Sequence, residues 1–365
     1  MFKNSLRVSV IGTATLMAAG LITTTGLNAA GYYEGKTITL IVGFPAGGGV
    51  DASARVMADH LSKHIEGKPD VIVKNMSGAA SIKAQNFVYE KARPDGTTVF
   101  FGPWFPIAQI VKAPGVRFRY EKFTAIAAMA AGQAIFYGRA SLLPGGSKDP
   151  KNIVKVKGLK LAGSHPTNPM DARARLSLDL LGVNYNYVRG YRGSTKIRAA
   201  VLNGEVDVGG DSIRGYLGAI KPTMVATGKA IPLWTYPVPD ASGKLGRVAA
   251  TPNIPTVADV YRSINGKAPS GATWDALKFI LEAYGTASHF YLGPPTMNKT
   301  ARDALSKGIY ATARDKKYLA SAVKRFKTTP VHRELSLAVQ AIKKLASIDP
   351  KVKATIQAHV KAGLK

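Results

Sequence analysis

The strongest constraint on the fold is a β-branched run at residues 36–42 that leads at once into a glycine-rich turn at 44–51. Apolar residues then recur near helical spacing at Ala54, Met57, Leu61 and Ile65. The run has the length and composition of a β-strand, and the spacing is that of an amphipathic helix. A strand, a tight turn and a helix in direct succession predict one βα unit of an α/β fold.

The βα pattern recurs along the chain. We predict further strands at residues 71–73, 98–101, 160–162, 185–188, 206–209, 231–234 and 289–292. Helices are predicted at 81–91, 170–181, 195–202, 213–220 and 274–284, and over most of the C-terminal remainder. Residues 236–270 are rich in Pro, Gly and Ser and are predicted to be mainly loop. The chain of 365 residues has the length of two domains. We therefore expect two units with parallel sheets and helices on both faces, joined through the apolar segment 123–137.

The N-terminus has the layout of a cleaved secretory signal. Lys3 and Arg7 precede a mostly apolar run at 8–22, and small residues follow at 29–31. The run is short and rich in Gly and Thr for a membrane-spanning helix. We expect residues 1–30 to be removed and the protein to be periplasmic, with an uncleaved anchor as the alternative. Cysteine is absent, which excludes disulfides, a thiol nucleophile, cysteine metal sites and a lipoprotein anchor.

The charge is unusual: 50 Lys and Arg against 22 Asp and Glu give +28. Such an excess attracts anions without specifying a fold. No nucleic-acid recognition motif is visible and the basic residues are dispersed, so we expect no nucleic-acid partner. Residues 299–365 carry 16 basic and 4 acidic residues, which a solvated face of amphipathic helices explains. Small acidic ligands and anionic surfaces remain as partner classes.

The glycine-rich turn is the sharpest local motif. Three glycines turn the backbone tightly and leave amides uncovered, and Asp51 is a suitable N-cap for the helix. Amides at a helix N-terminus bind anions, although this turn lacks the P-loop and dinucleotide signatures. Taken alone, the turn also fits a βα connection with no ligand. Because small-residue turns follow other strands at 75–81, 163–171 and 190–194, the pattern predicts an interdomain cleft for an anion.

These motifs resemble a known family. The segments KTITLIVGFPAGGGVDASARVMADHLSK, VIVKNMSGAASIKAQNFV and ARPDGTTVFFG resemble the start of tripartite tricarboxylate transporter receptors, the Bug-type periplasmic solute-binding proteins. Weaker similarity continues through KLAGSHPTNPM, VNYNYVRGYRGSTKIRAAVLNGEVDVGGDS, NIPTVADV and HFYLGPPTMNKTARDAL. The resemblance implies an α/β, two-lobed type II periplasmic binding protein fold with the ligand cleft between the lobes. It places lobe 1 at residues 31–131 plus 287–365 and lobe 2 at 132–286.

The resemblance implies a receptor, not an enzyme, with no cofactor. It would capture a di-, tri- or aromatic carboxylate and deliver it to the permease subunits of a tripartite tricarboxylate-type transporter, with a sensor kinase as another partner. The first turn would hold one carboxylate, through Phe44, Ala46, Gly47, Gly48 and Asp51. The lobe 2 loop would grip the other end, through Ser164, His165, Thr167 and Asn168. Positions that align near the cleft are Ser81, Pro103, Trp104, Tyr191 and Asp211.

Three residue-level expectations accompany this list. Arg192 can pair bidentately with a carboxylate, or it is a surface arginine closing its turn. Trp104 either walls the pocket or packs between the lobes. His60 and His64 have metal-ligand spacing but no third ligand nearby in the sequence, so we expect solvent-exposed histidines and no metal.

The chain departs from the family pattern in lobe 2. Pro166 and Pro169 interrupt a loop that is usually glycine-rich, and Arg173 and Arg175 follow it. Since proline removes amide donors, we expect side chains to read the distal end of the ligand. The segment 274–284 looks like an insertion. Ser164 and His165 are adjacent in sequence, which is not triad geometry, so a hydrolase is not expected. The rival function is an exported basic protein that reuses this fold to bind an anionic polymer or membrane.

Overall fold

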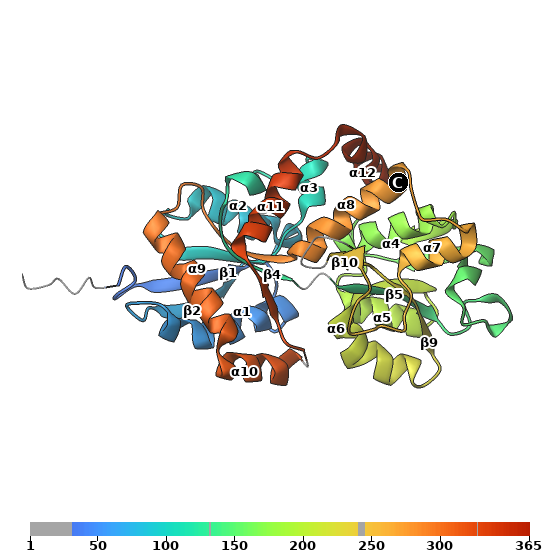
Figure 1. Cartoon of the computed structure of the whole chain (residues 1–365), viewed down its shortest axis with the longest axis horizontal. Coiled ribbons are helices and arrows are strands. Elements are labelled where there is room, and N and C mark those ends of the chain that lie inside the picture. The colour runs from blue at the N-terminus through green and yellow to red at the C-terminus, as the bar shows by residue number, and fades with distance from the viewer. Residues whose placement is uncertain (1–30, 131–132, 240–244, 327) are drawn as a thin grey trace, which may run out of the picture.

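Two α/β units, each built on its own sheet, make up the molecule (Figure 1). The computed structural model describes residues 31–130, 133–239, 245–326 and 328–365, so the predicted signal at 1–30 lies outside the described residues. We call the unit around the first sheet lobe 1 and the unit around the second sheet lobe 2. The boundaries predicted from the resemblance stay a prediction.

Lobe 1 has a six-stranded sheet in the order β13-β4-β12-β3-β1-β2. Its strands are β1 (Thr37–Val42), β2 (Asp70–Asn75), β3 (Thr98–Pro103), β4 (Thr124–Ala130), β12 (His289–Gly293) and β13 (Val331–Arg333). Lobe 2 has a five-stranded sheet in the order β7-β6-β8-β5-β9. Its strands are β5 (Ala134–Arg139), β6 (Leu159–Ala162), β7 (Tyr185–Val188), β8 (Val208–Ser212) and β9 (Ala230–Thr235).

The sheets are mixed, so the prediction of parallel sheets is wrong in part. β1 pairs in parallel with β2 and β3, whereas β12 is antiparallel to both β3 and β4. In lobe 2, β5 is antiparallel to β8 and β9. The physical reason is that parallel neighbours need a crossover connection. β5 and β12 each begin at the edge of their sheet that faces the other lobe. The neighbouring strands of that sheet end at this edge, so β5 and β12 run opposite to them.

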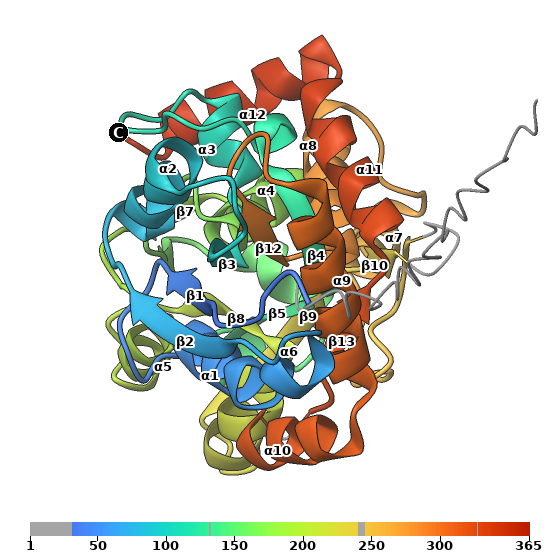
Figure 2. The same ribbon diagram turned by 90° about the vertical axis from the view of Figure 1, so that its left-hand side faces the viewer.

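Helices cover both faces of the lobe 1 sheet (Figure 2). The alternation along each strand decides which side chains face which layer. Leu40, Val42 and Phe101 pack with one layer, which contains α1 (Gly49–Leu61), α9 (Lys299–Arg314) and α10 (Lys316–Phe326). Ile41 and Phe100 pack on the opposite side, where α2 (Ile82–Lys91), α3 (Pro106–Ile110) and α11 (Leu335–Ala346) lie. The α1 layer is the one that borders the glycine-rich turn.

Lobe 2 contains α4 (Pro169–Leu180), α5 (Ser194–Leu202), α6 (Ile213–Gly215) and α7 (Val257–Asn265). α6 continues into a π-helical stretch, Tyr216–Val225. The composition of residues 236–270 does not predict α7 or the short pair β10 (Val238–Pro239) and β11 (Leu245–Gly246). A capping box between Thr256 and Asp259 starts α7 and stabilises it within a segment whose composition predicts loop.

The helical segments α8 (Ala272–Thr286) and α12 (Pro350–Ala362) lie across the junction of the lobes (Figure 1). α8 packs on α4, α11 and α12. Gln357 of α12 donates to the Ile110 carbonyl of lobe 1 at 3.1 Å, and Arg175 of lobe 2 donates to the His359 carbonyl at 2.8 Å. The C-terminal helix therefore contacts both lobes. Within the described ranges, no helix combines the length and apolarity that a membrane crossing requires.

The histidine His332 on β13 couples folding to pH. Neither ring nitrogen has a hydrogen-bond partner among the described residues, and burial lowers the pKa of His332 to about 4. An unfolded histidine has a pKa near 6.5, so the unfolded chain takes up a proton first as the pH falls. The stability present above pH 6.5 is therefore lost between about pH 6.5 and pH 4, by on the order of 2 kcal/mol at pH 5.

We expect His332→Gln to remove much of this pH dependence. Unfolding by urea at pH 7.5 and pH 5.0 should show a smaller loss of stability for the variant than for the wild type. Val331→Thr, a change without a titratable group at the exposed first residue of β13, is the control and should keep the wild-type loss. An unchanged loss in His332→Gln contradicts the assignment.

Candidate functional site

The glycine-rich turn joins β1 to α1 and is open to solvent. Ala46, Gly47 and Gly48 are exposed, and Phe44 is partly buried. Gly47 has a φ of +80°, which glycine adopts without strain. Gly48 is the N-cap, and no side chain caps α1. The first amides of the helix have no intrahelical acceptor, so this end presents uncovered donors to an anion.

The buried side chain of Asp51 holds this turn in place through hydrogen bonds. Its carboxylate is 2% exposed and accepts from the Gly47 amide at 2.8 Å. Asn75, at the end of β2, donates to the other carboxylate oxygen at 2.9 Å and to the Phe44 carbonyl at 2.9 Å. Burial raises the pKa of Asp51, but hydrogen bonds from Arg55, Gly47 and Asn75 outweigh it and hold the pKa below its usual value. Asp51 is therefore an ionised residue that positions the turn.

The predicted N-cap role of Asp51 is wrong. The residue is the third of α1, and its carboxylate reaches back to Gly47 instead of capping the helix. The Gly47 amide, which the resemblance assigned to the ligand, is therefore used within the protein. The donors left for a ligand are those of the first helical turn.

A second turn of lobe 1 packs directly against the first. Ala79, Ala80 and Ser81 have φ values of 46°, 50° and 79°, a left-handed conformation that costs energy for residues other than glycine. Ser81 is buried, and its hydroxyl has no partner among the described residues. A Cβ at Gly43 would lie 1.9 Å from that hydroxyl oxygen, so only glycine fits at the end of β1. An unpartnered buried hydroxyl beside the turn marks a place for a water or a ligand atom.

Lobe 2 repeats the device of Asp51. Asp171 is the third residue of α4 and is 4% exposed. One of its carboxylate oxygens accepts from the amides of Ser164 at 2.6 Å and His165 at 2.8 Å, and from the Tyr187 hydroxyl at 2.8 Å. Burial raises the pKa of Asp171 despite these hydrogen bonds. The two loop amides are therefore occupied, and only side chains of this loop remain for a ligand.

The predicted loop residues lie together. The imidazole of His165 is exposed, and its Nδ1 lies 2.8 Å from the Thr167 hydroxyl. Asn168 caps α4 by accepting from the Met170 amide at 2.8 Å. The structure thus gives Asn168 a structural role, while His165 and Thr167 keep polar atoms near solvent.

Trp104 and its neighbour Pro103 lie at the end of β3. Trp104 has no exposed surface, and its indole donates to the Ala287 carbonyl at 2.7 Å. Its rings pack against Tyr120, Tyr284 and Phe290. Trp104 is therefore packed among aromatic rings in this conformation, and its role toward a ligand stays a prediction.

The remaining predicted residues lie in lobe 2. Tyr191 donates to Glu205 at 3.2 Å. Arg192 is exposed and makes no ion pair with a described residue, which fits both of its interpretations. Asp211 is 1% exposed, accepts from the Ser212 amide at 2.7 Å and lies 3.8 Å from Arg198. Burial raises the pKa of Asp211. The predicted residues thus come from both lobes, and their roles toward a ligand stay predictions.

His60 and His64 were predicted to be solvent-exposed, and this prediction is wrong. His60 lies 3.1 Å from the Ser321 hydroxyl, and His64 lies 2.8 Å from the Asp315 carboxylate. Both are partly buried. The pair attaches α10 to lobe 1.

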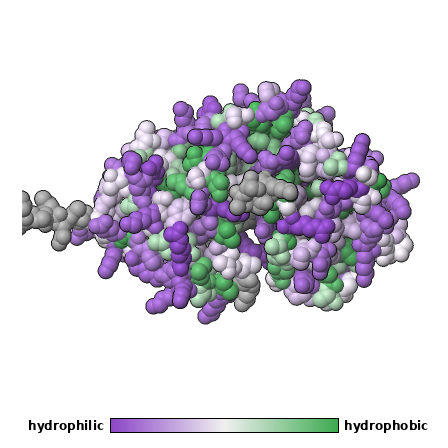
Figure 3. All heavy atoms as spheres, viewed as in Figure 1, coloured by the Kyte–Doolittle hydropathy of each residue, from purple (hydrophilic) through white to green (hydrophobic). Residues whose placement is uncertain are grey.

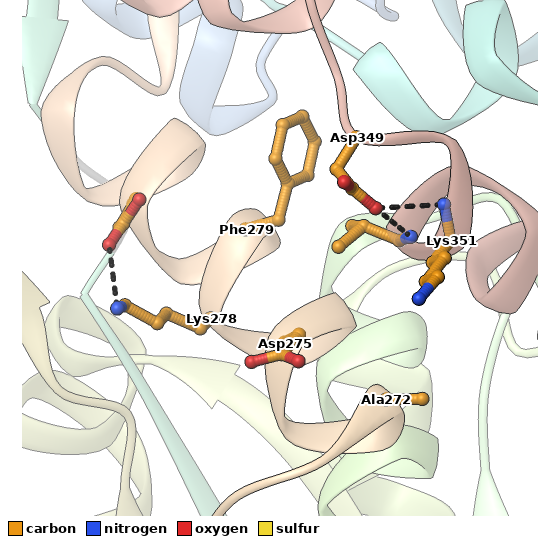
Figure 4. A pocket seen from close by; sticks show the side chains of 8 residues that line it. Ala272, Asp275, Lys278, Phe279, Asp349 and Lys351 are labelled. Atoms are coloured by element: carbon orange, nitrogen blue, oxygen red, sulfur yellow. Dashed lines mark hydrogen bonds and ion pairs between the residues drawn. The ribbon is translucent and has the colours of Figure 1, made fainter.

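The surface is hollowed between the lobes along the lower edge of Figure 3. Two other pockets lie away from the predicted residues. One of about 530 Å³ is formed by α8 and the start of α12, where Lys278, Phe279 and Asp349 line it (Figure 4). The other, of about 320 Å³, includes Tyr310 and His332. Neither pocket contains a residue that the sequence assigns to the ligand.

Among known proteins, no model of a protein family matches this chain. A curated relative, the UPF0065 protein in the TAR-I ttuE-ttuC′ intergenic region of Agrobacterium vitis, is 27% identical over 229 residues. The match spans 62% of this chain and 61% of the length of that relative.

Solved structures match over nearly their whole length. The periplasmic binding protein BugD has a TM-score of 0.63 at 19% identity, covering 91% of this chain and 99% of BugD. MatC of Rhodopseudomonas palustris with bound malate has a TM-score of 0.63 at 19% identity, covering 88% and 99% of the two chains. A second R. palustris protein, solved with adipate, has a TM-score of 0.64 at 19% identity, covering 88% and 97%. These matches confirm the predicted resemblance in its fold: the chain has the two-lobed α/β fold of the Bug-type periplasmic binding proteins.

Proposed function

We propose that this protein is a periplasmic receptor that binds a small organic carboxylate in the cleft between its lobes. The observation that carries the proposal is the uncapped, exposed start of α1, held at the carboxyl end of β1 by Asp51. Uncovered amides and the helix dipole together stabilise an anion at such an end. Ligands of open α/β sheets bind at the carboxyl ends of strands, which is where this turn lies.

Lobe 2 supplies the second half of the site in this proposal. His165 and Thr167 offer polar side-chain atoms, because Asp171 takes the loop amides. The solved relatives support a carboxylate ligand, since MatC holds malate and the second R. palustris protein holds adipate. Amides and hydroxyls bind such a ligand without covalent chemistry, so we propose binding without catalysis.

The physiological role that we propose is delivery to a membrane transporter of the tripartite tricarboxylate type, with a sensor kinase as the other candidate partner. A receptor of this kind closes over its ligand by a hinge motion. The chain returns to the lobe 1 sheet at β12, and this crossing is part of the proposed hinge. Export through the predicted signal at residues 1–30 is part of the same proposal.

The second candidate function is binding of an anionic polymer or membrane. The observation that favours it is α10, whose exposed side chains include Lys316, Lys317 and Lys324 and which contains no acidic residue. Binding of this kind falls steeply with salt, because counterions screen exposed charges. It would also survive loss of the glycine-rich turn, which separates it from the receptor proposal.

The direct test is a carboxylate screen on refolded, ligand-stripped protein. We expect at least one di-, tri- or aromatic carboxylate to raise the melting temperature by a few degrees at 100 times its Kd, since this adds about 2.7 kcal/mol of stability. Calorimetry then measures Kd. Absence of a shift with every carboxylate, in protein whose circular dichroism is native, contradicts the proposal. Salt-sensitive binding to anionic vesicles in that case supports the second candidate.

Asp51→Ala tests the turn. The change leaves the Gly47 amide without its acceptor and removes one of the two acceptors of the Asn75 side chain, so we expect a loss of about 1–3 kcal/mol in stability. Carboxylate affinity should fall by about tenfold or more, because the turn is no longer held in place. Asp59→Ala makes the same charge change at an exposed position of the same helix and should leave both quantities near wild type. Equal carboxylate affinity of the two variants contradicts the role of Asp51.

A further inference from the structure

Arg214 of lobe 2 reaches into lobe 1. It lies in α6, directly after β8, and is partly buried. Its guanidinium carbon lies 5.6 Å from the centre of the Phe326 ring at the end of α10, and α10 belongs to lobe 1. The side chain therefore contacts both lobes. It lies next to the start of β5, because the amide of the preceding residue, Ile213, donates to the Gln133 carbonyl at 3.1 Å.

Within the part of the chain that the structure describes, this arginine has no counter-charge. No described residue makes an ion pair or a hydrogen bond with the Arg214 guanidinium, whereas neighbouring Arg198 lies 3.8 Å from the Asp211 carboxylate. Burial lowers the pKa of Arg214, and a partly buried cation without a partner is costly. The nearest titratable group of β12, His289, responds to this charge: burial first and then Arg214 lower the pKa of His289 to about 3. The junction is thus an electropositive place where no acidic side chain of the described residues pairs with Arg214.

Strand register relates this place to the glycine-rich turn. His289 of β12 pairs with Pro103 of β3, and its ring lies 6.0 Å from the Phe101 ring. Phe101 pairs with Val42, the last residue of β1 before the turn. Because neighbouring strands are about 4.8 Å apart, β12 and β1 are separated by about 10 Å. Phe101 also packs with α1 and α10, so Arg214 approaches the α1 face of the sheet.

We propose that Arg214 binds the second carboxylate of a ligand whose first carboxylate lies at the start of α1. The inference rests on the proposed function and narrows its ligand to a short molecule with two anionic groups. A guanidinium grips a carboxylate bidentately, which gives both strength and orientation. Because Arg214 comes from lobe 2 and α1 from lobe 1, such a ligand links the lobes directly. Arg214 is not among the site residues predicted from the sequence, and none of those residues places a cation at the junction of the lobes.

The test compares dicarboxylates with their half-esters. Calorimetry with succinate, malate and adipate, and with the monomethyl esters of succinate and adipate, is performed on wild type, Arg214→Gln and Arg214→Lys. We expect Arg214→Gln to weaken dicarboxylate binding by about 10- to 100-fold and half-ester binding by less than about threefold. Arg214→Lys should be intermediate, since lysine keeps the charge without the bidentate geometry. Lys221→Gln, an exposed cation of the following π-helical stretch, is the control and should bind like wild type.

The outcomes separate the two proposals. Wild type that binds no carboxylate overturns both. Wild type that binds a dicarboxylate with the same affinity as Arg214→Gln overturns the role of Arg214 and leaves the receptor function standing. Equal weakening of dicarboxylate and half-ester also overturns it, since the loss is then not at the second carboxylate. Should Arg214→Gln fail to fold, the wild type alone decides: equal affinity for a dicarboxylate and its half-ester contradicts the inference.

Discussion

The candidate site depends on one hydrogen-bonding device that is present in both lobes. A carboxylate in the first turn of a helix accepts hydrogen bonds from backbone amides of the loop that precedes that helix. Asp51 holds the glycine-rich turn of lobe 1, and Asp171 holds the proline-containing loop of lobe 2. Without these bonds each loop would have to be ordered by the ligand, at the cost of conformational entropy. The device fixes the loops and also decides which donors remain for a ligand.

Local sequence patterns predicted the elements that local physics determines. The β-branched run at the start of the chain is β1, the periodic segment after the turn is α1, and β7 has the predicted bounds. The direction of β5 and β12 could not be predicted, because it follows from the path between two lobes and not from residues in either strand. α7 was missed because one capping box outweighs a loop-like composition.

The site shows the same division. The glycine-rich turn is recognisable from sequence because its residue types determine its backbone. The roles of Trp104 and Asp51 depend on partners elsewhere, such as the Ala287 carbonyl and the Asn75 amide. Arg214 has no local signal at all. A single arginine after a strand is ordinary in a chain with 50 basic residues, and only its contact with Phe326 across the lobes distinguishes it. In our proposal, the large positive charge attracts anions and the one cation at the junction selects a ligand with two carboxylates.

The most direct measurement is mass spectrometry of the small molecule that the protein retains when it is purified from the periplasm under native conditions. The account predicts one bound molecule per chain, released on denaturation, that carries two carboxylates. A protein that retains no carboxylate from the compartment, or that instead carries fragments of an anionic polymer, contradicts the central claim.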